Sequence, residues 1–168
     1  VEQWEKNLLA ALDGRKVDYL VVSHLEPDHA GSIGRLVELF PEVTLVGNAK
    51  TFHMLPQFFD ELPVDENHKI TVAEGESLSL GTHTLNFYMA PMVHWPEVMV
   101  TYESSEKILF SADGFGKFGA LDYEDPEGWA CEARRYYFNI VGKYGAPVQA
   151  LLKKAAGLDI CLLYTSPS

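Results

Sequence analysis

A short apolar strand that runs directly into a cluster of ligand-type side chains is the feature that most limits how this sequence can fold. Residues 17–23, Val-Asp-Tyr-Leu-Val-Val-Ser, are typical of a strand buried on both faces. His24, Glu26, Asp28 and His29 follow at once, at the end of the strand where open α/β sheets place their sites. Because alternate residues of an extended segment point to one side, we expect His24, Glu26 and Asp28 to converge, with His29 beside them.

The rest of the chain alternates helical and strand patterns and predicts an α/β protein. Apolar residues at helical spacing indicate helices, whereas short β-branched and aromatic runs with Gly-Thr and Ser-Ser turns indicate strands and hairpins. Two mixed sheets packed face to face, with helices outside, would accommodate this order. The expected helices are 4–12, 32–40, 48–59 with a kink at Pro56, 129–143 and 146–157, and the expected strands are 17–23, 43–47, several within 69–113, and one beginning at 158.

The amino-acid composition disfavours several classes of protein. A length of 168 residues with 47% hydrophobic content suits one globular domain, and a formal charge of -11 disfavours nucleic acid, which needs a basic surface. Cys131 and Cys161 form no metal-binding or disulfide pattern, and the apolar runs are too short for a membrane span. We therefore expect a cytoplasmic protein with no nucleic-acid or membrane partner. Clustered carboxylates that repel one another also favour cation binding.

Two further ligand candidates follow apolar strands in the middle of the chain. His94 comes after the run Thr-Leu-Asn-Phe-Tyr-Met-Ala, and Asp113 comes after Ile-Leu-Phe-Ser-Ala. Alone, each would be interpreted as an ordinary loop residue. Placed after buried strands in a chain that also carries the segment 24–29, both are predicted to be metal ligands.

These motifs resemble the metallo-β-lactamase superfamily, whose usual loop is His-x-His-x-Asp-His. Here Glu26 stands where the second histidine would be, a substitution that marks the flavodiiron proteins, also called A-type flavoproteins. The resemblance is carried by Val-Val-Ser-His-Leu-Glu-Pro-Asp-His-Ala-Gly-Ser-Ile (21–33), by 92–102 and by 109–121. A carboxylate in place of an imidazole also shifts preference from zinc towards iron.

The resemblance implies an α/β fold of the αββα metallo-β-lactamase type over residues 1–160, as a partial domain. It would place His24, Glu26 and His94 on one iron, Asp28 and His29 on the other, and Asp113 as the bridge. A final family histidine would follow a few residues beyond Ile160, where this sequence has none. We expect residues 161–168 to be a non-native tail and the chain to be truncated at both ends.

The resemblance further implies an oxidoreductase that reduces O2 to water, NO to N2O, or both. Its two iron ions would receive electrons from FMN, bound in a flavodoxin-like domain expected downstream. A head-to-tail homodimer and a donor such as rubredoxin or a flavin reductase would complete the electron path.

Two alternatives stay open at this point: a zinc hydrolase of esters, thioesters or lactones with the same fold, and a non-enzymatic module with a vestigial site. Trp95 could line a substrate pocket or pack under the ligand loop. Several other polar residues are interpreted as structural or solvated: His53, His68, His83, Arg134, Arg135, Lys143 and the helix-capping acids Asp122, Glu124 and Asp125.

Overall fold

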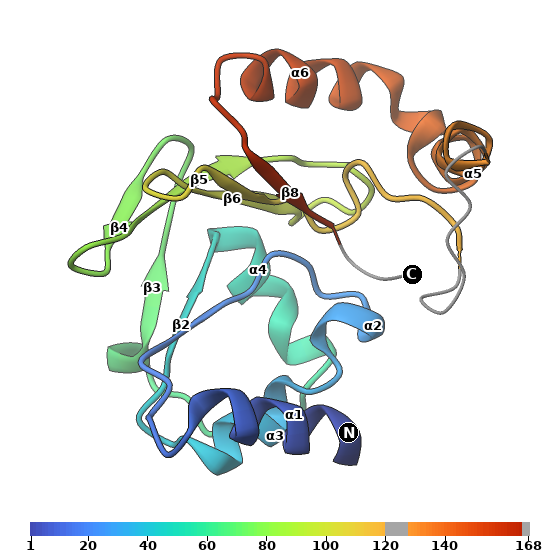
Figure 1. The fold of residues 1–168 in the computed structure, drawn as a ribbon. Coiled ribbons are helices and arrows are strands. Elements are labelled where there is room, and N and C mark those ends of the chain that lie inside the picture. The colour runs from blue at the N-terminus through green and yellow to red at the C-terminus, as the bar shows by residue number, and fades with distance from the viewer. Residues whose placement is uncertain (120–127, 166–168) are drawn as a thin grey trace. The chain divides into compact units, whose positions relative to one another are not determined.

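A computed structural model describes residues 1–119 and 128–165 of the chain (Figure 1). Two compact units make up the molecule, Val1–Thr71 and Val72–Ser168. Each unit has its own sheet and its own hydrophobic core. The acidic segment that contains Asp122, Glu124 and Asp125, for which helix capping was predicted, lies outside the described residues.

The first unit opens with the predicted amphipathic helix. This helix, α1 (Glu2–Leu12), ends where Asp13 and Gly14 adopt positive φ angles of 47° and 77°, a common way to stop a helix. Trp4 and Leu8 pack against the core of the unit. The helix is also tied to α3 (Ile33–Leu39) by Arg35, whose Nε lies 2.8 Å from Oε2 of Glu5. The hydrogen bond from this guanidinium lowers the pKa of the Glu5 carboxyl.

The sheet of the first unit has the order β1 (Tyr19–Val21), β2 (Thr44–Gly47), β3 (Lys69–Thr71) and is parallel throughout its described strands. The prediction of two mixed sheets is therefore wrong for this one, because the helices between its strands supply the crossovers that parallel pairing needs. The central strand β2 is buried from Leu45 to Gly47, with Leu45 and Val46 inaccessible to solvent, and only Thr44 is partly exposed. The edge strand β1 leaves Tyr19 39% exposed, so the expected burial on both faces is also wrong.

The third predicted helix begins as expected at Asn48. The Asn48 side chain accepts hydrogen bonds from the backbone N–H groups of Lys50 and Thr51, at 2.9 and 3.0 Å, and so caps α4 (Ala49–Met54). Pro56 then lies in a short 3₁₀ turn, η1 (Leu55–Gln57), that ends the α-helical part. A second 3₁₀ turn, η2 (Glu66–His68), leads into β3.

The second unit contains a mixed sheet whose strands lie in sequence order. These strands are antiparallel except for β7 and β8, which pair in parallel. All five residues of the central strand β6 are buried. The strands are β4 (Ser77–Ser79), β5 (Thr84–Met89), β6 (Met99–Glu103), β7 (Ile108–Phe110) and β8 (Leu162–Tyr164).

The turn between β6 and β7 is organised by a carboxylate. Glu103 accepts hydrogen bonds from the backbone N–H groups of Ser105 and Glu106, at 2.9 and 2.6 Å. Burial of the Glu103 carboxyl acts to raise its pKa, but these hydrogen bonds and a contact with His83 outweigh it and lower the pKa to about 2. Glu103 is therefore held ionised in the folded chain.

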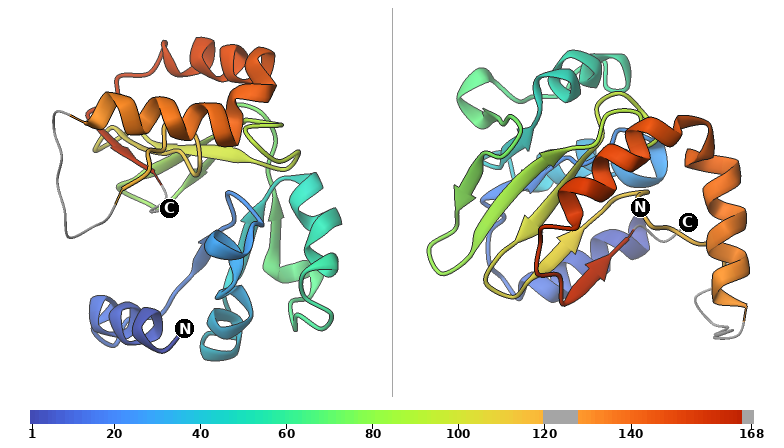
Figure 2. Two further views of the ribbon diagram at one scale, coloured as in Figure 1. Left: turned by 90° about the vertical axis from the view of Figure 1, so that its right-hand side faces the viewer. Right: turned by 90° about the horizontal axis from the view of Figure 1, so that it is seen from above.

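Helices of the second unit follow the prediction with one change of geometry. The expected helix 129–143 consists of α5 (Trp129–Tyr136), a π-helical segment η3 (Tyr137–Val141) and a 3₁₀ turn η4 (Gly142–Tyr144). Next comes α6 (Gly145–Ala155), which lies beside the sheet of its unit (Figure 2). Its Val148 and Leu151 belong to the hydrophobic core of that unit. Lys154 anchors the end of α6 by donating to Glu74 Oε2 and to the backbone oxygen of Met89, at 2.7 and 2.6 Å.

The final strand begins later than expected. Residues 158–161 were predicted as a strand, but they precede it and are fastened to the sheet through Asp159. The backbone oxygen of Asp159 accepts from the Tyr102 hydroxyl at 2.7 Å, and its carboxylate pairs with Lys107. The β7–β8 pairing itself starts at Leu162, opposite Ile108. The non-native origin of residues 161–168 stays a prediction.

Candidate metal centre

The ligand segment of the first unit leaves β1 extended and then turns into a helix. His24 is buried, and Glu26 has an extended backbone at φ -59° and ψ 140°. From Pro27 the chain forms α2 (Pro27–Ala30), a single helical turn in which Asp28 occupies the first turn. The predicted alternation of an extended segment therefore ends at Glu26.

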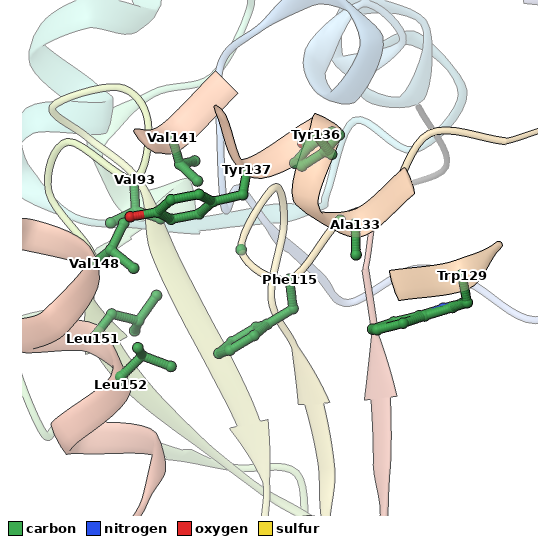
Figure 3. A pocket seen from close by; sticks show the side chains of 12 residues that line it. Val93, Phe115, Trp129, Ala133, Tyr136, Tyr137, Val141, Val148, Leu151 and Leu152 are labelled. Carbon is green, nitrogen blue, oxygen red and sulfur yellow. The ribbon is translucent and has the colours of Figure 1, made fainter. Parts of the chain in front are cut away.

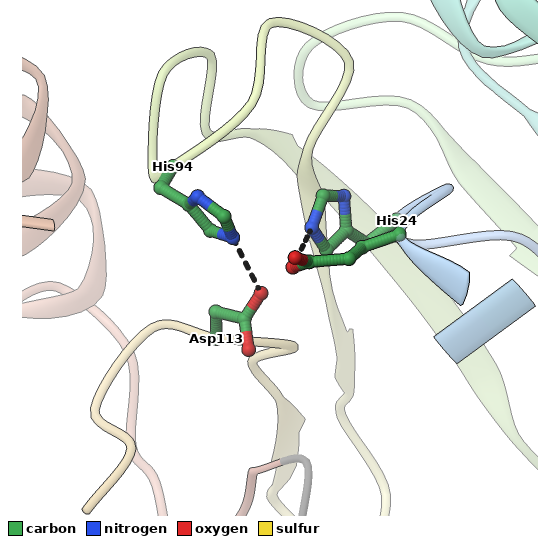
Figure 4. Close-up of side chains that lie close together, drawn as sticks. His24, His94 and Asp113 are labelled. Carbon is green, nitrogen blue, oxygen red and sulfur yellow. Dashed lines mark hydrogen bonds and ion pairs between the residues drawn. The ribbon is translucent and has the colours of Figure 1, made fainter. Parts of the chain in front are cut away.

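The four polar side chains of this segment form two close pairs. Nε2 of His24 lies 3.3 Å from Oε2 of Glu26, as the dashed line in Figure 4 marks, and Nε2 of His29 lies 3.5 Å from Oδ2 of Asp28. The rings of His24 and His29 are 5.0 Å apart. Metal bonds of about 2.1 Å place neighbouring ligand atoms about 3–3.5 Å apart, so each pair is compatible with two ligands on one metal ion as well as with an ordinary ion pair.

The second unit brings together its own two predicted ligands. His94 lies in the loop after β5, Asp113 lies in the loop after β7, and these strands flank β6 on opposite sides. Nε2 of His94 is 3.2 Å from Oδ2 of Asp113 (Figure 4). This separation again equals that of two ligands on one ion. Both side chains are thus placed at strand ends, as the sequence predicted.

Asp113 is held in place by a tyrosine that sequence reasoning did not single out. The Tyr136 hydroxyl, from the end of α5, donates a hydrogen bond of 2.8 Å to Oδ1 of Asp113, which directs Oδ2 towards His94. Both residues are only 3% exposed. A Cβ atom at Gly116 would lie 2.6 Å from the Tyr136 ring, so only glycine permits this close approach.

Sequence signals for these two supporting residues were weak. The Tyr136 position at helical spacing indicates an ordinary core residue. The repeated glycines of Gly-Phe-Gly-Lys-Phe-Gly, residues 114–119, do mark a segment where backbone and side chains approach closely. They do not say which side chain packs there.

Trp95 and the histidines that were not assigned as ligands lie in packed, exposed or ion-paired positions. The Trp95 ring meets the His94 ring edge-on at 6.1 Å and packs against the core of the second unit, which favours packing over a pocket role. His53 is exposed on α4. His68 Nδ1 lies 2.9 Å from Oδ1 of Asp65, and His83 Nδ1 lies 3.2 Å from Oε1 of Glu103.

Comparison with known proteins identifies the family. A family model described as "ODP family beta lactamase" matches residues 2–134. This chain belongs to that family. It is 34% identical to a nitric oxide reductase of Moorella thermoacetica and 32% identical to a rubredoxin-oxygen oxidoreductase of Megalodesulfovibrio gigas, matching 99% and 95% of its own length.

Solved structures agree with this assignment. The flavodiiron protein of Giardia intestinalis matches 98% of the chain with a TM-score of 0.85 and 28% identity. The predicted metallo-β-lactamase-like fold and the resemblance to flavodiiron proteins are confirmed. The chain spans only 43% and 40% of the two curated relatives and 41% of the Giardia protein. Within the described residues, no helix is both long and apolar enough to cross a membrane.

Proposed function

We propose that this chain forms the di-iron domain of a flavodiiron oxidoreductase that reduces O2 to water, NO to N2O, or both. The observation that carries the proposal is the position of Glu26, whose carboxylate lies 3.3 Å from His24 Nε2 where the superfamily motif has a histidine. An oxygen ligand there makes the donor set harder and more suitable for iron than for zinc. Relatives named as a nitric oxide reductase and a rubredoxin-oxygen oxidoreductase support the same reaction class.

The proposed centre has six ligands, which the family motif assigns to two irons. His24, Glu26 and His94 would hold one iron, Asp28 and His29 the other, and Asp113 would bridge them. Support comes from the three close pairs, each of which has the spacing of adjacent ligands on an ion. A histidine beyond Ile160 of the natural protein would complete the second iron, as the family motif implies.

The side chains of this domain would hold and orient the metals. The Tyr136 hydroxyl donates a hydrogen bond to Oδ1 of Asp113 and so restrains this carboxylate in the orientation that directs Oδ2 towards His94. Burial shields the ligand atoms of His24 and Asp113 from bulk water, whereas the side chains of Glu26 and Asp28 are 35% and 48% exposed. A pair of ferrous ions held by these residues would supply electrons and adjacent binding positions for a diatomic substrate.

The proposal also covers the electron donors, the oligomeric state and the cellular location of the protein. FMN in a flavodoxin-like domain would deliver electrons, within a head-to-tail homodimer and from a donor such as rubredoxin or a flavin reductase; the relatives' names support a rubredoxin-type donor. We also propose a cytoplasmic location. The exposed, unbridged thiols of Cys131 and Cys161 fit a reducing compartment.

Metal preference tests the proposal against the zinc-hydrolase alternative. The full-length protein would be loaded anaerobically with equal ferrous iron and zinc, and its metal content and O2 and NO consumption measured. We expect iron to be retained with substrate consumption. Because Glu26→His restores the usual His-x-His-x-Asp-His motif, it should shift the retained metal towards zinc. Zinc retention with ester or thioester hydrolysis in the unaltered protein would overturn the proposal.

A further inference from the structure

A pocket of about 260 Å³ opens within the second unit between its helices and the loop that follows Asp113. Figure 3 shows side chains from α5, the π-helical segment and α6 directed into the same space. Its walls are aromatic and aliphatic and include Phe115, Trp129, Ala133, Tyr137, Leu151 and Leu152. We call it the aromatic pocket.

The chemistry of the aromatic pocket favours a small apolar occupant. Among its lining residues, all in the described part of the chain, none carries a charge. The hydroxyl of Tyr136, which also lines the pocket, is directed at Asp113. The pocket is open on one side, since Phe115, Trp129 and Leu152 are 38%, 53% and 40% exposed. A charged ligand would find no countercharge on its walls, whereas a small apolar molecule that enters it displaces water from apolar surface.

The aromatic pocket adjoins both ligand loops of its unit. Val93 and Gly114 line it, and they are the direct neighbours of His94 and Asp113 in the chain. Tyr136 joins the pocket wall to the Asp113 carboxylate by its hydrogen bond. The π-helical segment contributes Tyr137 and Val141, and such wide turns occur often at functional sites.

We propose that the aromatic pocket binds the diatomic substrate, O2 or NO, and holds it beside the loops that carry His94 and Asp113. This inference rests on the proposed function for the identity of the gas. O2 and NO are small and weakly polar, so they partition from water into an apolar space. The pocket would raise their concentration next to the metal ligands and so lower the substrate concentration needed for half-maximal rate.

Xenon tests the pocket without any metal. The 168-residue chain would be titrated with xenon and followed by ¹²⁹Xe NMR. Ala133→Phe projects a ring into the pocket and should weaken xenon binding about tenfold, since it removes the void. Ala150→Phe makes the same change at an exposed position of α6 and should leave xenon binding unchanged. Leu152→Trp fills the pocket from the opposite wall and repeats the test if Ala133→Phe unfolds, which circular dichroism would show.

Steady-state kinetics of the full-length, iron-loaded protein test whether the pocket concentrates the substrate beside the metal ligands. Ala133→Phe should raise KM for O2 or NO about threefold while kcat stays unchanged, the pattern of lost substrate binding. No xenon binding in the unaltered chain, or an unchanged KM when xenon binding is lost, would overturn the inference. If the full-length protein reduces neither gas yet xenon binds and Ala133→Phe blocks it, the proposed function fails and only the gas-binding pocket stands.

Discussion

The two units hold their proposed ligands in different ways. The first unit carries His24, Glu26, Asp28 and His29 in one short segment, whereas the second brings His94 and Asp113 together from loops that follow different strands. In the first unit, chain connectivity alone keeps the donors close. In the second, the sheet and the helices beyond it must be folded before the two side chains meet. The four donors of the first unit can therefore be identified from one continuous motif. That the side chains of His94 and Asp113 meet depends on the packing of the folded unit.

Backbone strain and supporting contacts are concentrated around the distant pair. Met92 and Ala112 have positive φ angles of 65° and 48°, near His94 and Asp113 respectively. Such angles are unfavourable for residues with a side chain and persist only where surrounding contacts impose them. The Ser111 hydroxyl, which donates to the backbone oxygen of Gly114 at 2.7 Å, supplies one of these contacts. The second unit should therefore be the more sensitive to changes in its scaffold.

The largest expected effect is that of Gly116→Ala. The new Cβ would lie 2.6 Å from the Tyr136 ring, so the ring or the loop must move, and we expect a loss of about 1–3 kcal/mol in the free energy of unfolding. Thermal and urea unfolding would measure it. Gly145→Ala is the matched control, since nothing lies within 4 Å of its added Cβ and its φ of -54° suits alanine. Equal stabilities of the two variants would contradict the supporting role of Gly116.

Tyr136→Phe should have the next largest effect. It removes one buried hydrogen bond to a carboxylate while keeping the packing of the ring, and is expected to cost about 1.5 kcal/mol. It should also weaken ferrous iron binding, because Asp113 can then rotate. Urea unfolding and an iron titration would measure the two effects. Tyr137→Phe makes the same change one residue along, away from this hydrogen bond. If both variants bind iron equally well, Tyr136 does not position Asp113.

Asn48→Ala probes the scaffold of the first unit. Loss of the cap, which accepts from Lys50 and Thr51, should lower the free energy of unfolding by about 1 kcal/mol. Asn7→Ala, on the exposed face of α1, should leave stability unchanged or slightly raised, because alanine is the better helix former. Urea unfolding of the two variants decides between them; an equal loss in both would show that the cap contributes nothing.

The smallest expected effect is a pH dependence at Glu103. Its pKa in the folded chain, about 2, lies below its ordinary value of 4.5, so the ionised group stabilises the fold above about pH 4.5. That contribution is lost as the pH falls from 4.5 towards 2. The difference in Tm between the unaltered chain and Glu103→Gln should shrink over this range. Glu61→Gln, at an exposed position, should show no such trend; a constant difference for Glu103→Gln would refute the prediction.

Particular elements show which parts of the fold and of the site can be predicted from the sequence. Helices α1, α3 and α4 followed from apolar periodicity with the stop at Gly14 and the cap at Asn48, because these signals are local. The position of β8 and the all-parallel first sheet could not be predicted from the sequence, since both depend on pairing between distant segments. Ligand types followed from the motif, but the Tyr136 hydrogen bond to Asp113 required the packing of α5 against the loop after β7.

Iron content tests the central claim most directly. A longer form of the chain, extended through the final histidine that the family motif implies, would be reconstituted anaerobically with ferrous iron and analysed beside its Asp113→Ala and His53→Ala variants. We expect about two iron ions per chain in the unaltered protein and in His53→Ala, as for a dinuclear site. Asp113→Ala should lose dinuclear binding. Equal iron content in the two variants, or no iron in the unaltered protein, would contradict it.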